Sequence, residues 1–284
     1  MPPLKTMKSI QSSFDNQINK TIHYCWFGRT PLPELALRCI NSWKKHFPDY
    51  EIKLWNEDNF NVNMIPYTSE AYAAKKYAFV SDFARFWILY HHGGLYFDTD
   101  VEVIRNMNHI IEKGPFMGCE KKSVLNASAM AIGVAPGLGL GATPGLALYQ
   151  EIIDLYSRLH FTLPNGKLNL RTVVEYTTEV LCRHGLVNTP AIQQAGGVWI
   201  YPQDYFAPKD VDSKKLTITE NSVSIHHYDA SWAEWYDKAA EHRGRILNCY
   251  LGKWLGSRLN AFMHVIQSGG CKLLLKKIIK RLFK

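Results

Sequence analysis

Residues 69–103 constrain the fold of this chain more than any other segment does. Residues 69–92 have the periodicity of a helix, and large apolar side chains surround that helix almost completely. Gly93 and Gly94 are placed to end it, and residues 95–103 follow as a short aromatic strand interrupted by two carboxylates. The chain is 46% hydrophobic and 20% charged, which is typical of globular proteins, so this segment belongs to the interior of a folded domain.

Strands and helices alternate along the chain. Residues 20–28 predict a buried strand, residues 34–43 a helix and residues 50–55 a second strand, an order that is typical of the start of an α/β domain. The later elements that we expect are helices at 145–160, 171–184 and 231–250, and strands at 198–201 and 222–226. The sequence therefore predicts an α/β fold.

The domain organisation is simple, because the sequence contains neither an internal repeat nor a linker. We predict a polar N-terminal segment at residues 1–20, one Rossmann-like domain at 21–250, and a C-terminal helical region at 251–284. The uncharged residues 124–149 are rich in glycine and proline, which favours strands and a loop over a membrane-spanning helix.

The positive charge of the chain is concentrated at its C-terminal end. The formal net charge is +8, and residues 272–284 hold six basic residues and no acid, which leaves +2 for the remainder. On a helical projection residues 271–284 form an amphipathic basic helix, too short to span a bilayer. We therefore expect this tail to bind an anionic membrane surface, and we expect no nucleic-acid partner.

Cysteine spacing and the N-terminal residues indicate the compartment. The six cysteines have no zinc-site spacing, and reduced thiols are the expected state in a chain of this length. The first twenty residues lack the apolar core of a signal peptide. We therefore expect a cytoplasmic protein, held peripherally on the inner face of the cytoplasmic membrane by its tail.

Asp98 and Asp100 form a D-x-D motif at the end of the aromatic strand. In an extended chain, side chains two residues apart point to the same side, so both carboxylates can converge on one divalent cation. Ligand sites in open α/β sheets lie at the carboxyl ends of strands, where such a cation would bridge to phosphates. Taken alone, the motif is more often a solvated turn than a metal site.

Asp82 and Arg85 add a second signal, because they lie on one face of the buried helix that precedes the motif. Burial of an acid and a base costs several kcal/mol unless they pair with each other or with a ligand. A structural ion pair is one interpretation, and a ligand-binding helix is the one that we favour.

The complete pattern from Ser81 to Asp100 is S-D-x-x-R-x-x-x-L-Y-x-x-G-G-x-Y-x-D-x-D. It resembles the D-x-D sugar-binding region of nucleotide-sugar glycosyltransferases of family 32, relatives of yeast initiating mannosyltransferases and clostridial toxin glucosyltransferase domains. The resemblance extends to residues 22–28 and to residues 225–232. It implies a GT-A fold with a mixed central sheet flanked by helices, a Mn²⁺ or Mg²⁺ cofactor, and a retaining transfer.

The resemblance also implies roles for individual residues. Asp98, Asp100 and His227 would hold the metal, and Asp82, Arg85, Asp98 and Asp100 are the catalytic candidates. The donor-binding residues implied are Trp26 against the base, Asn56, Ser81, Asp82, Arg85, Tyr96, Asp98, His226, His227, Ser231 and Trp232. The segment from His226 to Trp232 would close over the donor diphosphate and exclude water.

The donor and acceptor follow from the family and the tail together. We expect a UDP-linked hexose as donor and a polyprenyl-diphosphate-linked glycan as acceptor, in surface polysaccharide biosynthesis. No compelling acid or base for the acceptor hydroxyl is evident, with Asp204 and Glu175 as candidates only. Retention could proceed through a carboxylate nucleophile or through front-face attack, in which the leaving phosphate takes the acceptor proton. We favour the second.

Two other functions are compatible with parts of the sequence. A metal-dependent phosphohydrolase also places D-x-D after an apolar strand, but Glu102 stands where such enzymes normally carry Thr or Val. A non-catalytic module that binds anionic membranes or nucleic acid would explain the tail. Such a module would have no need of the four charged residues at these spacings, Asp82, Arg85, Asp98 and Asp100.

Overall fold

The computed structural model of the chain describes residues 17–126, 129–211 and 213–229, and, further on, residues 243, 244, 247, 251, 252, 254–261 and 263. The side chains of residues 121–126 and 129–131 are not included. The chain divides into two compact units, the first ending at Tyr228 and the second beginning at Asp229. The predicted tail at 271–284, the helix at 231–250 and residues Ser231 and Trp232 lie outside the residues described or largely so.

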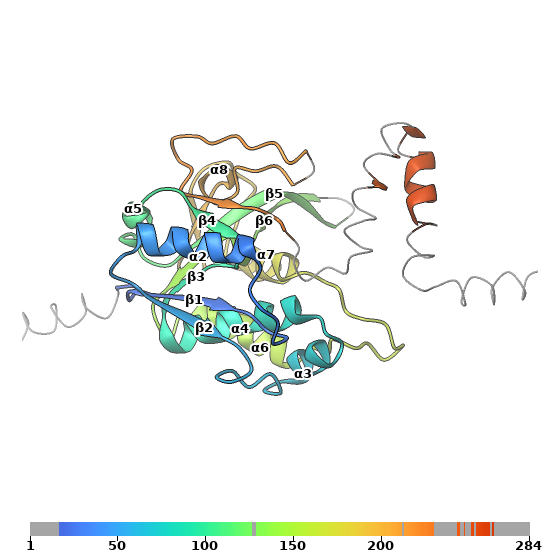
Figure 1. The fold of residues 1–284 in the computed structure, drawn as a ribbon, viewed down its shortest axis with the longest axis horizontal. Coiled ribbons are helices and arrows are strands. Elements are labelled where there is room, and N and C mark those ends of the chain that lie inside the picture. Colours follow the sequence, from blue (N-terminus) through green and yellow to red (C-terminus); the bar gives the residue numbers. More distant parts are fainter. Residues whose placement is uncertain are drawn as a thin grey trace, which may run out of the picture. The chain divides into compact units, whose positions relative to one another are not determined.

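The first unit alternates strands and helices, as the sequence predicts (Figure 1). Its strands are β1 (Thr21–Cys25), β2 (Glu51–Trp55), β3 (Gly94–Tyr96), β4 (Val101–Val103), β5 (Phe116–Asn126), β6 (Ala129–Val134), β7 (Leu140–Ala142), β8 (Gln193–Ala195), β9 (Val198–Tyr201) and β10 (Ser224–His226). Its helices are α2 (Glu34–His46), α3 (Pro66–Ala73), α4 (Tyr77–His92), α5 (Asn108–Ile111), α6 (Ala147–Ser157), α7 (Val173–Arg183) and α8 (Gln203–Phe206), with a 3₁₀ turn η1 (Pro136–Leu138).

A mixed sheet forms the centre of this unit. Its strands lie in the order β2-β1-β3-β7-β5-β9-β8, and β6 pairs with β5. Strand β1 is parallel to β2 and β3, whereas β7 is antiparallel to both β3 and β5, and β5 is parallel to β9. Strands β1, β2, β3, β5 and β9 therefore run in the same direction and end at the same edge. The predicted α/β fold with a mixed central sheet is confirmed.

Helices cover both faces of the sheet. Figure 1 shows α2 on one side of strands β1 to β3, and α3, α4 and α6 on the other side. Side chains alternate between two apolar clusters: Leu95 and Phe97 join the cluster under α2, whereas Tyr96 joins the cluster under α4. Both faces are buried, which explains why β3 is apolar at every position.

Two predicted elements are wrong in their boundaries. The helix expected at 69–92 is two helices, because Lys75 adopts the left-handed conformation (φ 56°) between α3 and α4 and breaks the helix there. The strand expected at 95–103 is interrupted between β3 and β4 by a turn that contains the D-x-D motif. The backbone N–H of Val101 donates to the carbonyl oxygen of Asp98 at 3.0 Å and closes that turn.

The glycine-rich stretch at 124–149 contains β6, η1 and β7, together with the end of β5 and the start of α6, so strands and a loop are found there, as expected. Strand β7 lies between β3 and β5, so this segment completes the middle of the sheet. Among the residues that the structure describes, every helix is too short or too polar to cross a bilayer.

His23, on β1, connects the end of β2 with the turn between α4 and β3 through two hydrogen bonds. Its Nδ1 accepts a hydrogen bond from Trp55 Nε1 at 3.0 Å, so its Nε2 carries the proton and donates to the carbonyl oxygen of Gly93 at 3.1 Å. Gly94 follows with φ 93°, and a Cβ atom there would lie 2.5 Å from the carbonyl oxygen of Thr21. The turn between α4 and β3 therefore requires glycine.

Candidate active site

The candidate site lies at the edge where the parallel strands end. Trp26 follows β1, Asn56 follows β2 and Asp98 lies two residues after β3. Parallel strands present their carboxyl ends on the same side, so residues far apart in the sequence meet there. The edge predicted for a ligand site is therefore the edge at which these residues are found.

The D-x-D motif does not have the geometry that the sequence suggests. Asp98 and Asp100 belong to the turn between β3 and β4, and their side chains make separate contacts instead of sharing one face of an extended strand. Asp98 contacts Arg85, and Asp100 contacts His226. The turn thus divides the site into an Asp98 side and an Asp100 side.

On the Asp98 side, one guanidinium connects two carboxylates. Arg85 Nη2 lies 3.0 Å from Asp82 Oδ1 and 3.2 Å from Asp98 Oδ1. Arg85 Nε donates to the carbonyl oxygen of Ser81 at 3.1 Å, and the hydroxyl of Tyr96 donates to Asp98 Oδ1 at 3.0 Å. The side chains of Arg85, Asp82 and Asp98 are 4%, 11% and 27% exposed, so the Asp98 end of this cluster is the more open to a ligand.

The electrostatics of the cluster reflect its burial. Burial raises the pKa of Asp82 to about 7, although the positive charge of Arg85 opposes the rise. Burial also raises the pKa of Asp98, again against the influence of Arg85. Burial disfavours the charge on Arg85, but Asp98, Tyr96 and Asp82 outweigh it and raise the pKa of Arg85 above its ordinary value. Arg85 is therefore a fixed positive charge.

Gly137 supplies space for Asp98. The backbone N–H of Asp98 donates to the carbonyl oxygen of Gly137 at 3.2 Å. A Cβ atom on Gly137 would lie only 2.1 Å from Asp98 Oδ2 and 3.3 Å from Arg85 Nη1. The turn η1 must therefore present glycine at this position if Asp98 is to keep its contact with Arg85.

On the Asp100 side there are two adjacent histidines, and they contact different carboxylates. His226 is the last residue of β10, and His227 follows it. Strand β10 pairs with β4 in a separate two-stranded ribbon, which brings His226 opposite Val101. His226 Nε2 lies 3.1 Å from Asp100 Oδ1, whereas His227 Nε2 lies 2.8 Å from Glu102 Oε2. The histidine beside the D-x-D motif is therefore His226.

His226 is poised to carry a positive charge. Burial opposes its protonation, but Asp100, through charge and hydrogen bonding, and the more distant Asp98 and Glu120 raise its pKa. Its Nδ1 atom is buried and has no hydrogen-bond partner, and the same is true of the hydroxyl of Tyr228. A phosphate oxygen or a hydroxyl of a ligand could satisfy both groups.

The metal-ligating side chains of the site suit a divalent cation that is also coordinated by a bound ligand. Among the described residues, no three His, Cys, Asp or Glu side chains form a group that could hold a metal ion by themselves. Mg²⁺ is usually bound by one or two carboxylates and completed by substrate phosphates and water. Asp98 and Asp100, adjacent to one open edge, match that arrangement, and His227 stays a predicted ligand whose imidazole here contacts Glu102.

The remaining predicted donor-binding residues have local roles. Trp26 is half-buried, and its Nε1 donates to the carbonyl oxygen of Thr30 at 2.7 Å. The side chain of Asn56 accepts from the backbone N–H of Asp58 at 2.9 Å within the turn after β2. The hydroxyl of Ser81 donates to the carbonyl oxygen of Tyr77 at 3.3 Å. Their predicted contacts with a donor stay predictions.

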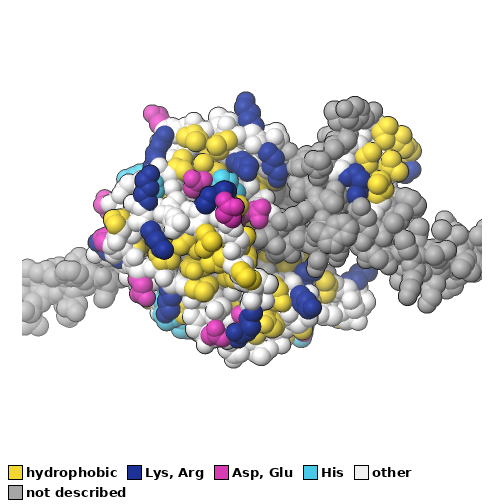
Figure 2. All heavy atoms as spheres, in the orientation of Figure 1, with side chains coloured by type: hydrophobic (Ala, Val, Ile, Leu, Met, Phe, Trp, Pro, Cys, Tyr) yellow, Lys and Arg dark blue, Asp and Glu magenta, His cyan; other side chains and the backbone are white. Residues whose placement is uncertain are grey.

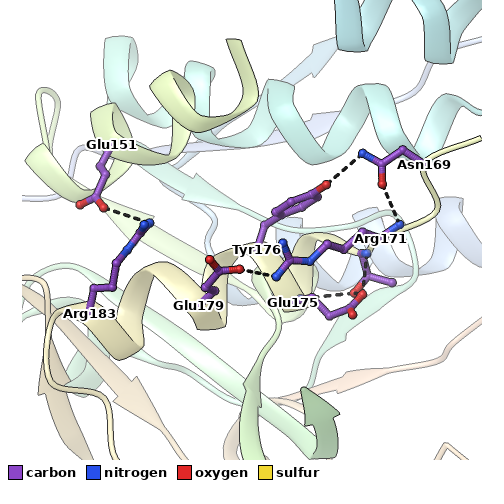
Figure 3. Close-up of polar contacts among 8 residues, drawn as sticks. Glu151, Asn169, Arg171, Glu175, Tyr176, Glu179 and Arg183 are labelled. Carbon is purple, nitrogen blue, oxygen red and sulfur yellow. Dashed lines mark hydrogen bonds and ion pairs between the residues drawn. The ribbon is translucent and has the colours of Figure 1, made fainter. Parts of the chain in front are cut away.

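The two carboxylates considered for the acceptor hydroxyl have structural partners. Glu175 forms the capping box of α7, where its Oε2 accepts from the backbone N–H of Thr172 at 2.9 Å (Figure 3). Asp204 Oδ2 accepts from Asn221 Nδ2 at 2.9 Å and from Thr219 Oγ1 at 3.2 Å. Neither side chain is free to act as a base without losing these hydrogen bonds.

Sequence reasoning missed two residues near the site, Glu120 and Tyr228. Glu120 follows the apolar run of β5, and its charge acts on both His226 and Tyr228. Tyr228 adopts a left-handed backbone conformation with φ 53°, which is uncommon for a tyrosine. An acid that interrupts an apolar run within a strand is the signal that could have identified Glu120.

Comparison with a family model agrees with this location. Residues 33–117 match the model of the family described as a glycosyltransferase sugar-binding region containing a DXD motif. The match includes Asp82, Arg85, Asp98 and Asp100. The predicted resemblance to D-x-D glycosyltransferases is therefore confirmed for this segment.

Curated relatives match over a similar part of the chain. Inositol phosphoceramide mannosyltransferase 1 of Schizosaccharomyces pombe is 29% identical over 112 residues, which cover 36% of this chain and 34% of the relative. Inositol phosphoceramide mannosyltransferase 3 of the same organism is 30% identical over 106 residues, which cover 36% of this chain and 30% of the relative. The chain thus matches about a third of the length of these relatives.

A solved structure, the PaToxG glycosyltransferase, resembles the chain at 18% sequence identity with a TM-score of 0.41. That match covers 63% of this chain and 77% of the solved chain.

Proposed function

We propose that the chain is a metal-dependent, retaining glycosyltransferase of the GT-A type that transfers a hexose from a nucleotide sugar to a lipid-linked glycan. The observation that carries the proposal is the Asp82–Arg85–Asp98 cluster within the segment that matches the D-x-D sugar-binding region. A structural ion pair would need one carboxylate, whereas this guanidinium holds two and leaves Asp98 partly open.

The cluster suits a sugar because its open end offers hydrogen-bond acceptors in fixed positions. An ionised carboxylate accepts several hydrogen bonds, and Asp98 has one oxygen, Oδ2, beyond the atom that Arg85 and Tyr96 contact. Hydroxyl groups of a hexose would donate to Asp98 and Asp82 while Arg85 keeps both carboxylates oriented. Discrimination between hexoses then depends on which hydroxyls reach these oxygens.

A bound Mn²⁺ or Mg²⁺ would act as a Lewis acid for the diphosphate that leaves. Asp98 and Asp100 are the residues that would hold it. His226 contacts Asp100, and its raised pKa and its buried Nδ1 without a hydrogen-bond partner suit a phosphate oxygen. We prefer UDP as the nucleotide, as the resemblance implies, with Trp26 against the base.

The preferred route is front-face attack, in which the acceptor oxygen forms its bond to the anomeric carbon on the side from which the diphosphate departs. The leaving phosphate takes the acceptor proton. This route agrees with the partners of Asp82 and Asp98, because a carboxylate that pairs with a buried guanidinium is a weakened nucleophile.

A membrane-bound acceptor agrees with three observations. The relatives named inositol phosphoceramide mannosyltransferases act, by their names, on a lipid-linked acceptor. The basic amphipathic residues 271–284 favour an anionic surface. In the second unit, Leu251, Trp254 and Leu255 are exposed on helical residues, and Trp254 is 69% exposed (Figure 2). Peripheral attachment to the cytoplasmic face would bring the site to a polyprenyl-diphosphate-linked glycan of surface polysaccharide synthesis.

A donor panel tests the catalytic proposal. Purified protein is mixed with UDP-, GDP- and dTDP-linked hexoses and Mn²⁺, and nucleotide release and product anomer are measured. We expect release from one donor class, loss of release with EDTA, and loss in Asp98→Asn and Asp100→Asn. The exposed Asp154→Asn serves as control and should retain full activity. Turnover that persists in EDTA contradicts the metal assignment.

A truncation tests the membrane proposal separately. Removal of residues 271–284 should abolish co-sedimentation with vesicles that contain anionic phosphatidylglycerol, while nucleotide release from the donor continues. Full-length protein on neutral phosphatidylcholine vesicles is the matched control, because the electrostatic attraction is absent there. Undiminished binding of the truncated protein to anionic vesicles would reject the tail as the anchor.

A further inference from the structure

A cleft of about 800 Å³ opens beside the candidate site. Its walls come from residues 119–120 of β5, just beyond the part of that strand that pairs with β9, and from β6, the end of β9, the segment before β8, and α8 with the residues that follow it. Strands β5 and β9 run parallel to β3, so the cleft lies at the same edge of the sheet as the D-x-D turn. A cleft of this size can enclose a ligand of one or two sugar rings.

Glu120 connects the cleft with the candidate active site. Its side chain lines the cleft, and its charge acts on His226, which contacts Asp100 at 3.1 Å. The charges of Glu120, Asp100 and Asp210 all act on Tyr228, and Asp210 also lines the cleft. Tyr228 packs against His226 with ring centroids 4.2 Å apart, so the Asp100 side of the site lies within electrostatic range of the cleft acids Glu120 and Asp210.

The carboxylate of Glu120 is available to a ligand, unlike those of the two other acids of the cleft. Asp204 accepts from Thr219 and Asn221, and Asp210 Oδ1 accepts from the backbone N–H of Ser213 at 2.7 Å. For Glu120 the structure contains no hydrogen bond or ion pair with any of the residues it describes. A largely buried carboxylate that has no hydrogen-bond partner is stabilised when a hydroxyl of a ligand donates to it.

The lining of the cleft indicates the chemistry of its occupant. Among the residues that the structure describes, three acids and one base, Lys215, face the cleft, so an anionic group is disfavoured inside. Hydroxyl and amide side chains such as Thr189, Thr217 and Gln203 alternate with the apolar side chains of prolines and isoleucines. A neutral sugar has the same character, because it presents hydroxyls at its edges and C–H groups on its faces.

We propose that this cleft binds the neutral sugar that accepts the transferred hexose, and that Glu120 accepts a hydrogen bond from a hydroxyl of that sugar next to the reacting one, whose own proton goes to the leaving phosphate. The proposal rests on the proposed glycosyltransferase function and adds the class of acceptor to it. Any diphosphate or lipid carried by the acceptor lies outside the cleft, away from its acids.

Binding is tested first, independently of turnover. Methyl α- and β-glycosides of glucose, galactose, mannose and N-acetylglucosamine are presented to the full chain, with glucose 6-phosphate as the anionic comparison, and saturation-transfer NMR detects contact. Ala191→Trp fills the cleft, and Ala73→Trp adds the same group at an exposed position on α3. We expect at least one neutral glycoside to bind, and its signal to fall about tenfold or more in Ala191→Trp only.

Turnover is tested second, with Glu120→Gln and the exposed control Glu112→Gln. With the glycoside that binds, Glu120→Gln should lower transfer about tenfold or more while donor hydrolysis changes less than about twofold. Absence of glycoside binding, equal binding in Ala191→Trp, or equal loss of hydrolysis and transfer in Glu120→Gln overturns the proposal. Cleft-dependent binding without any donor turnover supports the sugar cleft and refutes the glycosyltransferase function instead.

Discussion

Arg85 Nη2 lies 3.2 Å from Asp98 Oδ1 and so joins the interior of α4 to the D-x-D turn. The same atom lies 3.0 Å from Asp82 Oδ1, one turn earlier on the helix. Because Arg85 is almost wholly buried, its position is set by the packing of α4, and the position of Asp98 is set in turn by Arg85. The geometry of the candidate site therefore depends on a buried charge cluster.

Loss of the guanidinium should destabilise the protein in a pH-dependent way. Arg85→Met leaves Asp82 and Asp98 without a counter-charge, which costs about 3–5 kcal/mol in comparable buried pairs. Burial already raises the pKa of Asp82 to about 7, and removal of Arg85 raises it further, so protonation relieves the penalty as the pH falls. Urea unfolding should show a larger deficit at pH 8 than at pH 5.5. A deficit independent of pH would contradict this account, and Arg38→Met, at an exposed pair, is the control.

A methyl group on Gly137 should disturb Asp98 specifically. In Gly137→Ala the new Cβ atom would overlap Asp98 Oδ2, so Asp98 must leave its contact with Arg85 or the turn η1 must shift. We expect donor hydrolysis to fall about tenfold or more while a cooperative thermal transition persists. Lys45→Ala, at an exposed position of α2, is the control. Normal hydrolysis by Gly137→Ala would show that Asp98 tolerates displacement.

The parts of the fold that were predicted correctly have local signals. β-Branched and aromatic residues identify β1, and apolar side chains on almost every side identify α4. Each signal is contained within about sixteen residues of sequence. The break at Lys75 was missed because lysine has no preference for the left-handed conformation that it adopts there. It follows from how α3 and α4 pack, which a window of sequence does not contain.

The sequence pattern identified several residues of the candidate site, but it did not show how their side chains are arranged. The pattern from Ser81 to Asp100 identified the residues that meet at Arg85, since all of them lie on α4 or directly after β3. The separation of Asp98 from Asp100 depends on the ribbon of β4 and β10, whose strands are far apart in the sequence. The contact of His227 with Glu102 spans 125 residues, so no local pattern could show which histidine faces the motif.

The two adjacent histidines should differ in their effect on turnover. His226→Gln removes the imidazole that contacts Asp100, together with its buried Nδ1, so donor hydrolysis should fall about tenfold or more. His227→Gln interrupts a contact with the partly exposed Glu102, so hydrolysis should change less than about threefold. Steady-state kinetics at saturating Mn²⁺ compares the variants. The reverse order would place His227 at the metal, as the sequence alone predicts.

Buried His23 should make stability decrease in acid. Burial lowers the pKa of His23 from its ordinary value of 6.5 to about 4, despite the hydrogen bond to Gly93, so the unfolded chain binds a proton that the folded chain does not. The contribution of neutral His23 to the free energy of unfolding is at its full value above pH 6.5. It decreases as the pH falls toward 4, by roughly 3 kcal/mol in total. The raised pKa of Asp82 acts in the opposite direction over part of this range, so wild type and His23→Gln must be compared at each pH. Urea unfolding should show the advantage of wild type shrinking between pH 7 and pH 4, and an advantage that stays constant would mean that His23 does not titrate with folding.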